Sequence, residues 1–458
     1  MQQGLGLIGA VLAIMVASGV TGTAAAQGLI FPPDVDARFH WQDYQTLQGQ
    51  DLRGQRLTIL GTWLGQDKAL FDSVIAYFEA ATGADVVYEG SSSFEQQIVI
   101  RTQAGAPPDL AIVPQPGLAA DLARQGFLRP LAPDLGGWLL ENYAAGDSWR
   151  RIGTYRDPQG TERLYAFPYK AEIKSLVWYV PENLAEAGYP VPETYQDLRA
   201  LTERIVADGG TPWCIALGSG GATGWPATDW VEDLMLRLNT PADYDDWVAH
   251  EIRFQDPRVL AAIEAFGWFA TSDSFVDGGR AAVAGTDFRD SAQGLFTAPP
   301  RCYLLHQASF IASFFPAGTE LGRDADFFYF PTRAQAGPDR PVLGAGTLFV
   351  KLTDNPASDA FIRFLTLPLA HEIWMAQTGF ATPHKGVNPQ VYATPTQRKL
   401  GEILRDATVF RFDGSDLMPG AIGAGAFWRG MVDYVGGQSA AQVARQIDSR
   451  WDDLQAPQ

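Results

Sequence analysis

The stretch from Ser415 to Trp428 combines turn-forming residues with an aromatic pair, and its residue types most directly suggest ligand binding. It reads SDLMPGAIGAGAFW and precedes the last amphipathic helix that the sequence predicts. A rigidly held indole ring can stack on a flat, mostly apolar ligand face, so we expect Trp428 to bind a ligand at the mouth of a cleft. The alternative is that Phe427 and Trp428 only pack this helix onto the body of the protein.

Aromatic side chains are abundant along the whole chain. The sequence contains 13 Trp, 15 Tyr and 26 Phe among 458 residues. Trp and Tyr combine a flat apolar body with a polar tip and lose little conformational freedom on binding, so they suit the faces of sugar rings. Most of these rings are expected to belong to the core, and a minority to a binding site.

The first part of the chain alternates short strands with helices, which places several candidate residues on one rim. The apolar pattern predicts strands at Leu57–Leu60, Asp85–Tyr88 and Asp109–Val113, with helices at Ala69–Ala81 and Phe94–Ala104 between them. This alternation is typical of a mainly parallel sheet with right-handed crossovers. Ligands bind beyond the carboxyl ends of such strands, so we expect Trp63, Ser91–Ser93 and Gln115–Gly117 along one rim.

The rest of the chain predicts a second α/β unit, joined to the first by the long strand-like run Phe167–Tyr179. Beyond this run we expect helices at Thr194–Ala207, Asp229–Leu238, Ala357–Leu365 and Leu369–Gln377, strands at Thr211–Leu217, Cys302–Phe315 and Phe327–Phe330, and a return crossing at Pro341–Gly346. The chain from Tyr392 onward is expected to be helical, with one interruption at Phe410–Gly425.

Length and charge limit the possible functions. A chain of 458 residues is too long for one ordinary core, so we expect two or three domains. A hydrophobic content of 46% and a charged content of 19% are typical of a folded protein. The net charge of -18 and the pI near 4.7 argue against a nucleic acid partner, because a phosphate backbone attracts basic surfaces.

The N-terminus has most features of an export signal. An apolar run, Leu5–Val20, is followed by small residues up to Ala26, and we expect cleavage there, before Gln27. No charge occurs before Asp34, so either the signal is atypical or the start site is misassigned. A retained membrane anchor is the alternative.

Two cysteines, Cys214 and Cys302, are present. In an exported protein we expect them to form one disulfide, and the alternative is two separate buried thiols. Neither cysteine stands near the expected cleavage site, so a lipid-modified N-terminal cysteine is not expected. Two cysteines and five scattered histidines have no zinc-ligand spacing, so we expect no metal site and no cofactor.

At this point the chain resembles a known family, the periplasmic sugar-binding proteins of ABC importers, and within it the α-glucoside-binding group related to maltose-binding proteins. The resemblance spans roughly Leu57 to Trp451. The runs that carry it are Ala104–Leu110, Thr211–Ile215, Ala222–Trp230, Gln307–Ile311, Phe410–Pro419 and Ala426–Trp428.

The resemblance implies a two-lobed α/β periplasmic-binding-protein fold of type II, each lobe a mainly parallel sheet flanked by helices. It implies lobes at residues 27–168 with 345–380 and at residues 169–344 with 381–458, after a signal peptide at residues 1–26. Three hinge crossings are expected, near Phe167–Lys174, Pro341–Gly346 and Gln377–Lys385. The implied protein is a periplasmic monomer that is not an enzyme. It captures an α-linked disaccharide such as maltose, trehalose or sucrose, and delivers it to permease subunits in the inner membrane.

The resemblance also implies roles for single residues. Glu172 matches a hinge-region glutamate that accepts hydrogen bonds from sugar hydroxyl groups, which suits a carboxylate because its hydrogen bonds are charge-assisted. Its alternative is a solvated charge between two lysines. Trp225 matches a Trp-Pro loop of the second lobe, Trp428 matches a C-terminal stacking tryptophan, and Ser92 and Gln115 lie in loops that contact sugar in the relatives.

The chain departs from maltose-binding proteins at two places. The loop Gln115–Gly117 lacks their acidic and basic pair, and Gln307–Ser309 replaces their Gly-Pro-Trp. Trp63 and Asp229 are candidate substitutes, although Asp229 stands at an expected helix start and could be an N-cap.

Two further aspartates precede Met418. Asp413 and Asp416 could orient hydroxyl groups or only shape this turn, and we favour Asp416 as the ligand contact.

Two other functions remain open from the sequence. A glycoside hydrolase would also have aromatic residues and carboxylates in a cleft, but no motif singles out the spaced carboxyl pair that hydrolysis needs. A clamp for a cationic solute such as a polyamine would suit the acidic composition.

Overall fold

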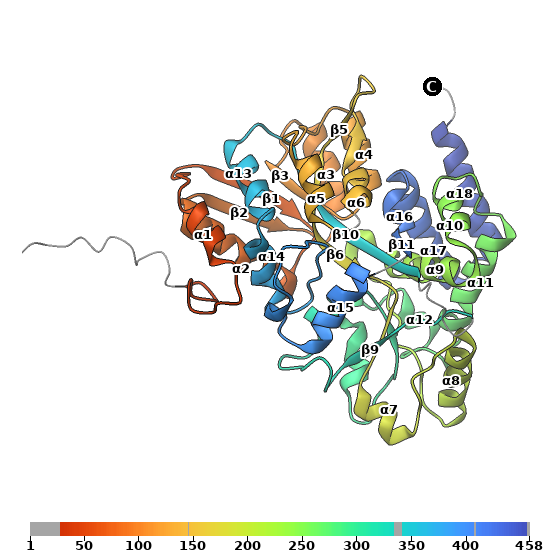
Figure 1. Cartoon of the computed structure of the whole chain (residues 1–458). Coiled ribbons are helices and arrows are strands. Elements are labelled where there is room, and N and C mark those ends of the chain that lie inside the picture. The colour runs from red at the N-terminus through yellow and green to blue at the C-terminus, as the bar shows by residue number, and fades with distance from the viewer. Residues whose placement is uncertain (1–27, 145, 334–340, 407–408, 456–458) are drawn as a thin grey trace, which may run out of the picture.

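The structure of the chain is a computed structural model that describes residues 28–144, 146–333, 341–406 and 409–455 (Figure 1). The expected signal peptide, residues 1–26, lies outside the described residues. No helix among the described residues combines the length and the apolar character that a membrane span needs.

The described residues form α-helices, strands and shorter helical turns. The α-helices are α1 (Trp41–Leu47), α2 (Gly65–Thr82), α3 (Phe94–Gln103), α4 (Pro116–Arg124), α5 (Leu135–Asn142), α6 (Gly146–Ile152), α7 (Pro181–Ala187), α8 (Tyr195–Ala207), α9 (Trp225–Leu238), α10 (Pro241–Val248), α11 (Pro257–Ala270), α12 (Arg280–Val283), α13 (Pro356–Leu365), α14 (Pro368–Met375), α15 (Pro395–Asp406), α16 (Gly414–Leu417), α17 (Trp428–Gly436) and α18 (Ala440–Gln455). The strands are β1 (Arg56–Gly61), β2 (Asp85–Gly90), β3 (Leu110–Val113), β4 (Thr154–Arg156), β5 (Glu162–Leu164), β6 (Ala166–Ile173), β7 (Leu176–Tyr179), β8 (Leu305–His306), β9 (Asp326–Tyr329), β10 (Pro341–Lys351) and β11 (Val409–Phe412). Shorter 3-10 helices lie at Gly220–Ala222, Phe288–Phe296, Ser309–Phe314 and Pro389–Val391, and a π-helix at Ala421–Phe427.

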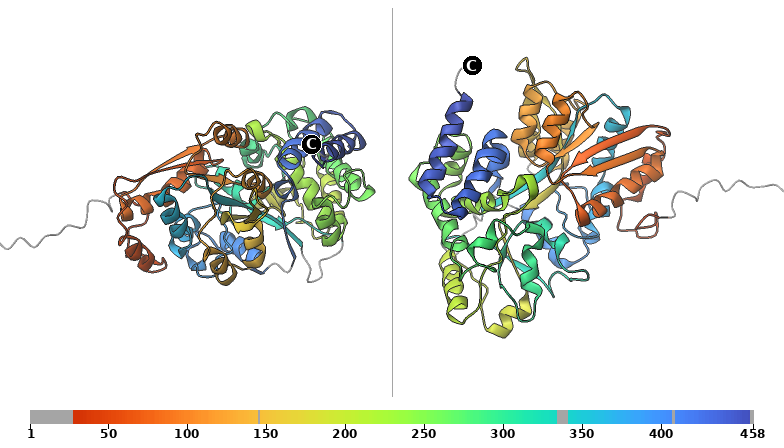
Figure 2. Two further views of the ribbon diagram at one scale, coloured as in Figure 1. Left: turned by 90° about the horizontal axis from the view of Figure 1, so that it is seen from above. Right: turned by 180° about the vertical axis from the view of Figure 1, so that it is seen from behind.

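The chain forms two lobes, as the sequence predicts (Figure 1). The first lobe contains β1–β3 with α2–α6, α13 and α14, and the second contains β7–β9 with α7–α12 and α16–α18. Figure 2 shows from behind that the blue C-terminal helices pack on the green helices of the second lobe, away from the strands of the first.

The predicted first-lobe strands and helices are confirmed. β1 lies between β2 and β3 and runs parallel to both. β3 is buried along its whole length, which is typical of parallel strands that are covered on both faces.

Strand β10 connects the two lobes. Its second half pairs antiparallel with β3, its first half pairs parallel with β11, and β6 pairs with it along most of its length. The register of the β10 and β6 pairing shifts between Thr347 and Leu348. Side chains of the second lobe hold the start of β10, because Arg237 Nη1 donates to the Pro341 carbonyl at 3.1 Å and the Leu343 amide donates to Ser175 Oγ at 2.9 Å.

The expectation of a mainly parallel sheet in the second lobe is wrong for the described residues. β7 pairs antiparallel with both β8 and β9. The chain enters β7 directly from β6 through Lys174 and Ser175, so the first sheet sets its direction, and β8 and β9 meet it running the other way.

Two predicted strands of this lobe are also shorter than expected. Only Leu305–His306 of the run Cys302–Phe315 is a strand, and Ser309–Phe314 is a 3-10 helix. Thr211–Leu217 forms single bridges rather than a ladder, since Trp213 bridges Val276 and Leu304 and the preceding Pro212 has no amide proton to donate.

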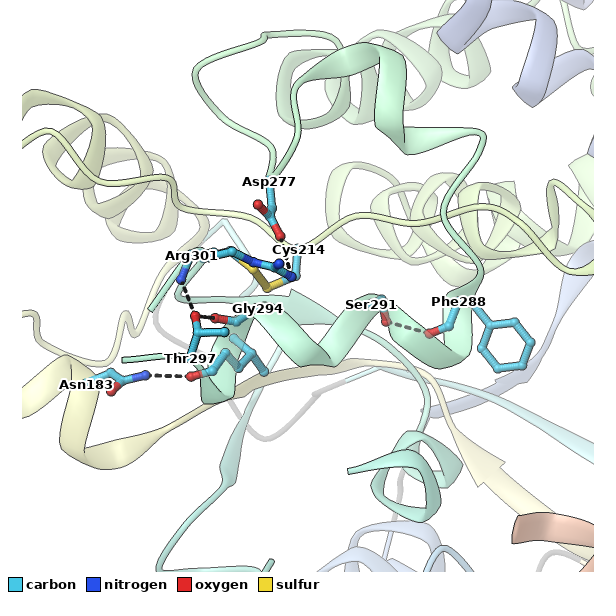
Figure 3. Close-up of a disulfide and its surroundings, with 10 residues drawn as sticks. Asn183, Cys214, Asp277, Phe288, Ser291, Gly294, Thr297 and Arg301 are labelled. Atoms are coloured by element: carbon cyan, nitrogen blue, oxygen red, sulfur yellow. Dashed lines mark hydrogen bonds and ion pairs between the residues drawn. A yellow bond between two sulfur atoms is a disulfide. The ribbon is translucent and has the colours of Figure 1, made fainter. Parts of the chain in front are cut away.

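The disulfide between Cys214 and Cys302 is confirmed, with the two Cα atoms 5.5 Å apart. Figure 3 shows it beside the 3-10 helix Phe288–Phe296, next to the ion pair of Asp277 and Arg301. A Cβ atom at Gly294 of this helix would lie 2.2 Å from the sulfur of Cys302, so the close approach requires glycine. The disulfide therefore fixes a helix whose first residues reach the site described below.

Replacing both cysteines by serine should lower the free energy of unfolding, because the bond joins positions with a sequence separation of 88. We expect a loss of about 2–4 kcal/mol in urea unfolding. Unfolding the original protein with a reducing agent should give a similar loss, and the double variant should not respond to the reductant. Equal stability of the two proteins under oxidising conditions would contradict this expectation.

Candidate functional site

A cavity of about 140 Å³ lies where the two lobes meet. Six of the ligand contacts that the sequence analysis expects line it: Trp63, Gln115, Glu172, Trp225, Asp416 and Trp428. Ser92 and Asp229 do not line it. The cavity is also lined by residues that the sequence analysis missed as ligand contacts: Asp67, Glu95, Lys170, Lys174, Phe288, Arg289, Phe310 and Phe314.

The rim predicted from the first sheet brings Trp63 and Gln115 to the cavity. Trp63 follows β1, and its amide donates to the Tyr88 hydroxyl at 2.8 Å. Gln115 precedes α4, and its Nε2 donates to Glu95 Oε1 at 3.2 Å. Ser92 follows β2, but its carbonyl accepts from the Gly221 amide of the second lobe at 3.0 Å, so it contacts protein outside the cavity.

Lys170 and Glu172 are alternate residues near the end of β6, so their charged side chains share one face of this strand. The ammonium of Lys170 lies 3.0 Å from Glu172 Oε1, and Ser309 Oγ donates to Glu172 Oε2 at 2.9 Å. Glu172 is only 5% exposed, so the alternative of a solvated charge is wrong. Burial raises the pKa of Glu172, and Lys170 opposes the shift.

Aromatic rings surround the ammonium of Lys170. It lies 4.7 Å from the ring centre of Trp374, 5.7 Å from that of Phe310 and 5.9 Å from that of Trp63. Ring faces attract a cation, so these contacts and Glu172 together compensate the buried charge.

Lys174 joins three distant parts of the chain. Its ammonium lies 2.7 Å from Asp229 Oδ1 and also pairs with Asp413. Asp229 is therefore an ion-pair partner, and the N-cap alternative is wrong because α9 begins earlier, at Trp225, with Gly224 as its N-cap.

The turn before Met418 is built around two carboxylates. Asp413 Oδ1 accepts from Ser415 Oγ at 2.9 Å and from the Asp416 amide at 2.8 Å. Glu232 accepts from the amides of Gly414 and Ser415, each at 2.9 Å. Asp413 thus shapes the turn, and Asp416 is directed to the cavity.

The surroundings of Lys174 shift the pKa of each neighbouring carboxyl group. Burial raises the pKa of Asp229, Glu232 and Asp416, and their neighbouring carboxylates, Asp413 among them, add to the shift. Burial acts in the same direction on Asp413, but the Lys174 ammonium and the hydrogen bonds from the Asp416 amide and Ser415 together outweigh it and lower the pKa of that carboxyl.

Three of these carboxyl groups, those of Asp229, Glu232 and Asp413, offer oxygen atoms within 4.8 Å of one another, a spacing that could hold a metal ion. The ammonium of Lys174 already lies against two of them and supplies the positive charge at this place.

Trp428 follows directly from the π-helix, and its ring is at the cavity although the residue is only 3% exposed. Its indole nitrogen donates weakly to Ser415 Oγ at 3.4 Å. Trp225 packs edge-on against Phe288, with 4.9 Å between ring centres. The indole of Trp428 is thus held by the turn that also carries Asp416.

Two of the residues that the sequence analysis missed, Asp67 and Arg289, are charged. Asp67 is the third residue of α2, is 6% exposed, and its Oδ1 has no hydrogen-bond partner among the described residues. In the sequence, the position of Asp67 just after the Trp63 loop was the one feature that could have indicated that it lines the cavity. Arg289 stacks on Phe288 at 4.4 Å and comes from a 3-10 helix without a periodic pattern, so no signal pointed to it.

Known proteins match this chain over most of its length. The family model "Bacterial extracellular solute-binding protein" matches residues 62–370. The chain is 61% identical to the alpha-glucosides-binding periplasmic protein AglE of Rhizobium meliloti (strain 1021), over 94% of each chain. It is 41% identical to the osmoprotective compounds-binding protein GgtB of Synechocystis sp., over 88% of this chain and 95% of the relative.

Solved structures share the fold at low sequence identity. The solute receptor AcbH, described as preferring β-D-galactopyranose, has a TM-score of 0.74 at 20% identity, over 87% of this chain and 99% of that one. Maltose-bound MalE3 of T. maritima has a TM-score of 0.64 at 14% identity, over the same shares of the two chains. The expected periplasmic-binding-protein fold is thereby confirmed.

Replacing Lys174 by methionine should destabilise the protein in a pH-dependent way. Without the ammonium, burial raises the pKa of Asp413 in the folded variant above the pKa of this group in the unfolded chain. The variant therefore keeps its stability at a pH below the unfolded-state pKa and loses stability as the pH rises through the raised folded-state pKa. We expect a loss of about 3–5 kcal/mol in urea unfolding at pH 8 and a smaller loss at pH 5.

The exposed Lys385 provides the control, because Lys385→Met should change the free energy of unfolding by no more than about 0.5 kcal/mol. A loss for Lys174→Met that is equal at both pH values would contradict the electrostatic role of Lys174.

Proposed function

The chain belongs to the family of bacterial extracellular solute-binding proteins, and on that premise we propose that it captures α-glucosides in the periplasm for an ABC importer. One observation carries the choice of ligand: the 61% identity, over 94% of each chain, to a protein named for binding α-glucosides. Maltose, trehalose and sucrose are the candidate ligands.

The side chains around the cavity suit such a ligand. The rings of Trp63, Trp225 and Trp428 offer flat apolar surfaces for sugar faces. Glu172 and Asp416 offer carboxylate oxygens for hydroxyl groups, and we add Asp67 because its buried Oδ1 is without a partner among the described residues. We also keep Gln115 as a contact, while Ser92 and Asp229 are no longer proposed as direct contacts.

The proposed mechanism is closure of the lobes around the sugar. The proposed contacts come from both lobes and from the strands that connect them, so a ligand makes all of them only in the closed state and shifts the population toward it. β6 and β10 would act as the hinge, together with the segment Gln377–Lys385, where Ala381 bridges Ala171 of β6. The expected lobe boundaries, at residues 168/169, 344/345 and 380/381, remain part of this proposal.

We further propose permease subunits of the inner membrane as the partner, a monomeric state, and cleavage of the leader near Ala26. The similarity to periplasmic and extracellular binding proteins supports a periplasmic location of the mature protein.

A receptor differs from the two other functions that the sequence left open. A glycoside hydrolase would release glucose, and a receptor for a cationic solute would bind spermidine in preference to sugars. Isothermal titration of the chain from Gln27 with maltose, trehalose, sucrose, glucose and spermidine tests all three, if each sugar is afterwards checked for cleavage. Micromolar or tighter binding of an intact disaccharide supports the proposal, and cleaved sugar or binding of spermidine alone refutes it.

Asp416→Asn should weaken binding of the preferred disaccharide without harming the fold. Burial raises the pKa of Asp416, so a neutral amide costs the folded protein little, but its NH2 group replaces one of the two oxygen atoms that can accept hydrogen bonds from sugar hydroxyl groups. We expect roughly tenfold weaker binding, about 1.4 kcal/mol, in isothermal titration. Asp453→Asn, on the exposed side of α18, is the control and should bind as the wild type does. Unchanged affinity of Asp416→Asn would remove Asp416 from the site.

A further inference from the structure

Two contacts outside the cavity join the rims of the two lobes. At the first, the Gly221 amide donates to the Ser92 carbonyl at 3.0 Å, and Gln96 Nε2 donates to the Gly221 carbonyl at 3.3 Å. At the second, the Gly420 amide at the start of the π-helix donates to Asp121 Oδ2 of α4 at 3.0 Å. These contacts join the rims of the two lobes, so the structure represents the closed arrangement.

Gly117 of α4 lies at the second contact, where the facing backbone of the other lobe leaves no room for a side chain at this position. A Cβ atom built there would lie 1.8 Å from the carbonyl oxygen of Met418 and 2.7 Å from its carbonyl carbon. Both atoms are backbone, so they cannot swing aside as the end of a side chain can. At the first contact, a Cβ atom at Gly221 would meet the flexible end of Gln96 at 2.7 Å, and one at Gly220 would lie 2.8 Å from the backbone carbonyl oxygen of Ser92.

The backbone of Gly117 does not itself require glycine. The residue is helical, within the first turn of α4, and it is not among the residues with positive φ. Alanine is intrinsically more favourable than glycine in a helix, by about 1 kcal/mol. The close approach of the other lobe, rather than local conformation, therefore accounts for glycine at this position.

We propose that Gly117 is a positioning residue that permits closure of the lobes, and that Asp121 then holds the closed state through the Gly420 amide. This inference rests on the proposed function, since it concerns the closure that captures the ligand. The Met418–Gly420 segment lies between Asp416 and Trp428 in the chain, so the closing contact and two cavity residues belong to one short stretch. Closure against Gly117 thus positions the residues that meet the ligand.

Gly117→Ala tests this inference, with Gly137→Ala as the matched control. Gly137 is also a helical glycine, but a Cβ atom there meets nothing within 4 Å. In isothermal titration with maltose, trehalose and sucrose, Gly117→Ala should bind the best wild-type ligand at least 100-fold more weakly, and Gly137→Ala within about twofold of wild type.

Thermal unfolding of the ligand-free proteins separates closure from folding. The melting temperature of Gly117→Ala should equal or exceed that of the wild type, because the open state gains a better helix former. Binding by Gly117→Ala within twofold of wild type, or a clear loss of its ligand-free melting temperature, would overturn the inference.

A second measurement needs no ligand. Cysteines introduced together as Gln96→Cys and Gly221→Cys lie on opposite lobes, and a short bismaleimide can link them only when the lobes close. Both native cysteines are in the disulfide and cannot react. Adding Gly117→Ala should slow this cross-linking at least tenfold, and an unchanged rate would overturn the inference. If the wild type binds none of the three sugars, the proposed function fails and the cross-linking rate alone decides the role of Gly117.

The role of Asp121 is tested by Asp121→Ala. Removing the acceptor of the Gly420 amide should weaken sugar binding about tenfold, mainly through faster dissociation in stopped-flow measurements. Arg124→Ala removes the other partner of Asp121 and should bind within twofold of wild type. Unchanged dissociation in Asp121→Ala would refute the holding role of Asp121.

Discussion

The pairing of Lys174 with Asp229 and Asp413 is the interaction on which the arrangement of the site depends. It joins the end of β6 to α9 and to the turn before α16, segments that are far apart in the sequence. A buried ammonium must be compensated, so these three segments have to meet at this place. Asp413 in turn binds the amide of Asp416, and Ser415 binds the indole of Trp428. One buried charge thus fixes the direction of two proposed ligand contacts.

Much of the site could be predicted because it follows from local patterns. Trp63 and Gln115 follow parallel strands, whose carboxyl ends share one rim, and the turn chemistry before Met418 pointed to Asp416 and Trp428. The topology of the first lobe was predictable for the same reason, since its apolar strands alternate regularly with helices. Glu172 and Trp225 were found by resemblance rather than by any pattern of their own.

The remaining features depend on long-range contacts that no local pattern reveals. Arg289 reaches the cavity from a 3-10 helix positioned by the disulfide, and the partners of Lys174 are 55 and 239 residues away. The second-lobe strands have two to four residues, too few to show the alternation that predicts a strand. Their antiparallel pairing depends on the direction of β7, which continues from β6 at the connection between the lobes.

The way β10 and β11 complete the central sheet has a consequence for synthesis of the protein. β1–β3 are made early, but β3 finds its neighbour β10 more than 200 residues later, and β11 follows after another 50 or more. Contacts between such distant segments form slowly, because a long loop must close first. The first lobe therefore cannot finish folding until β10, α13 and α14 have been synthesised, and the second lobe not until α18 has been synthesised. Until β10 is available, the exposed edge of β3 must be kept from pairing with other chains.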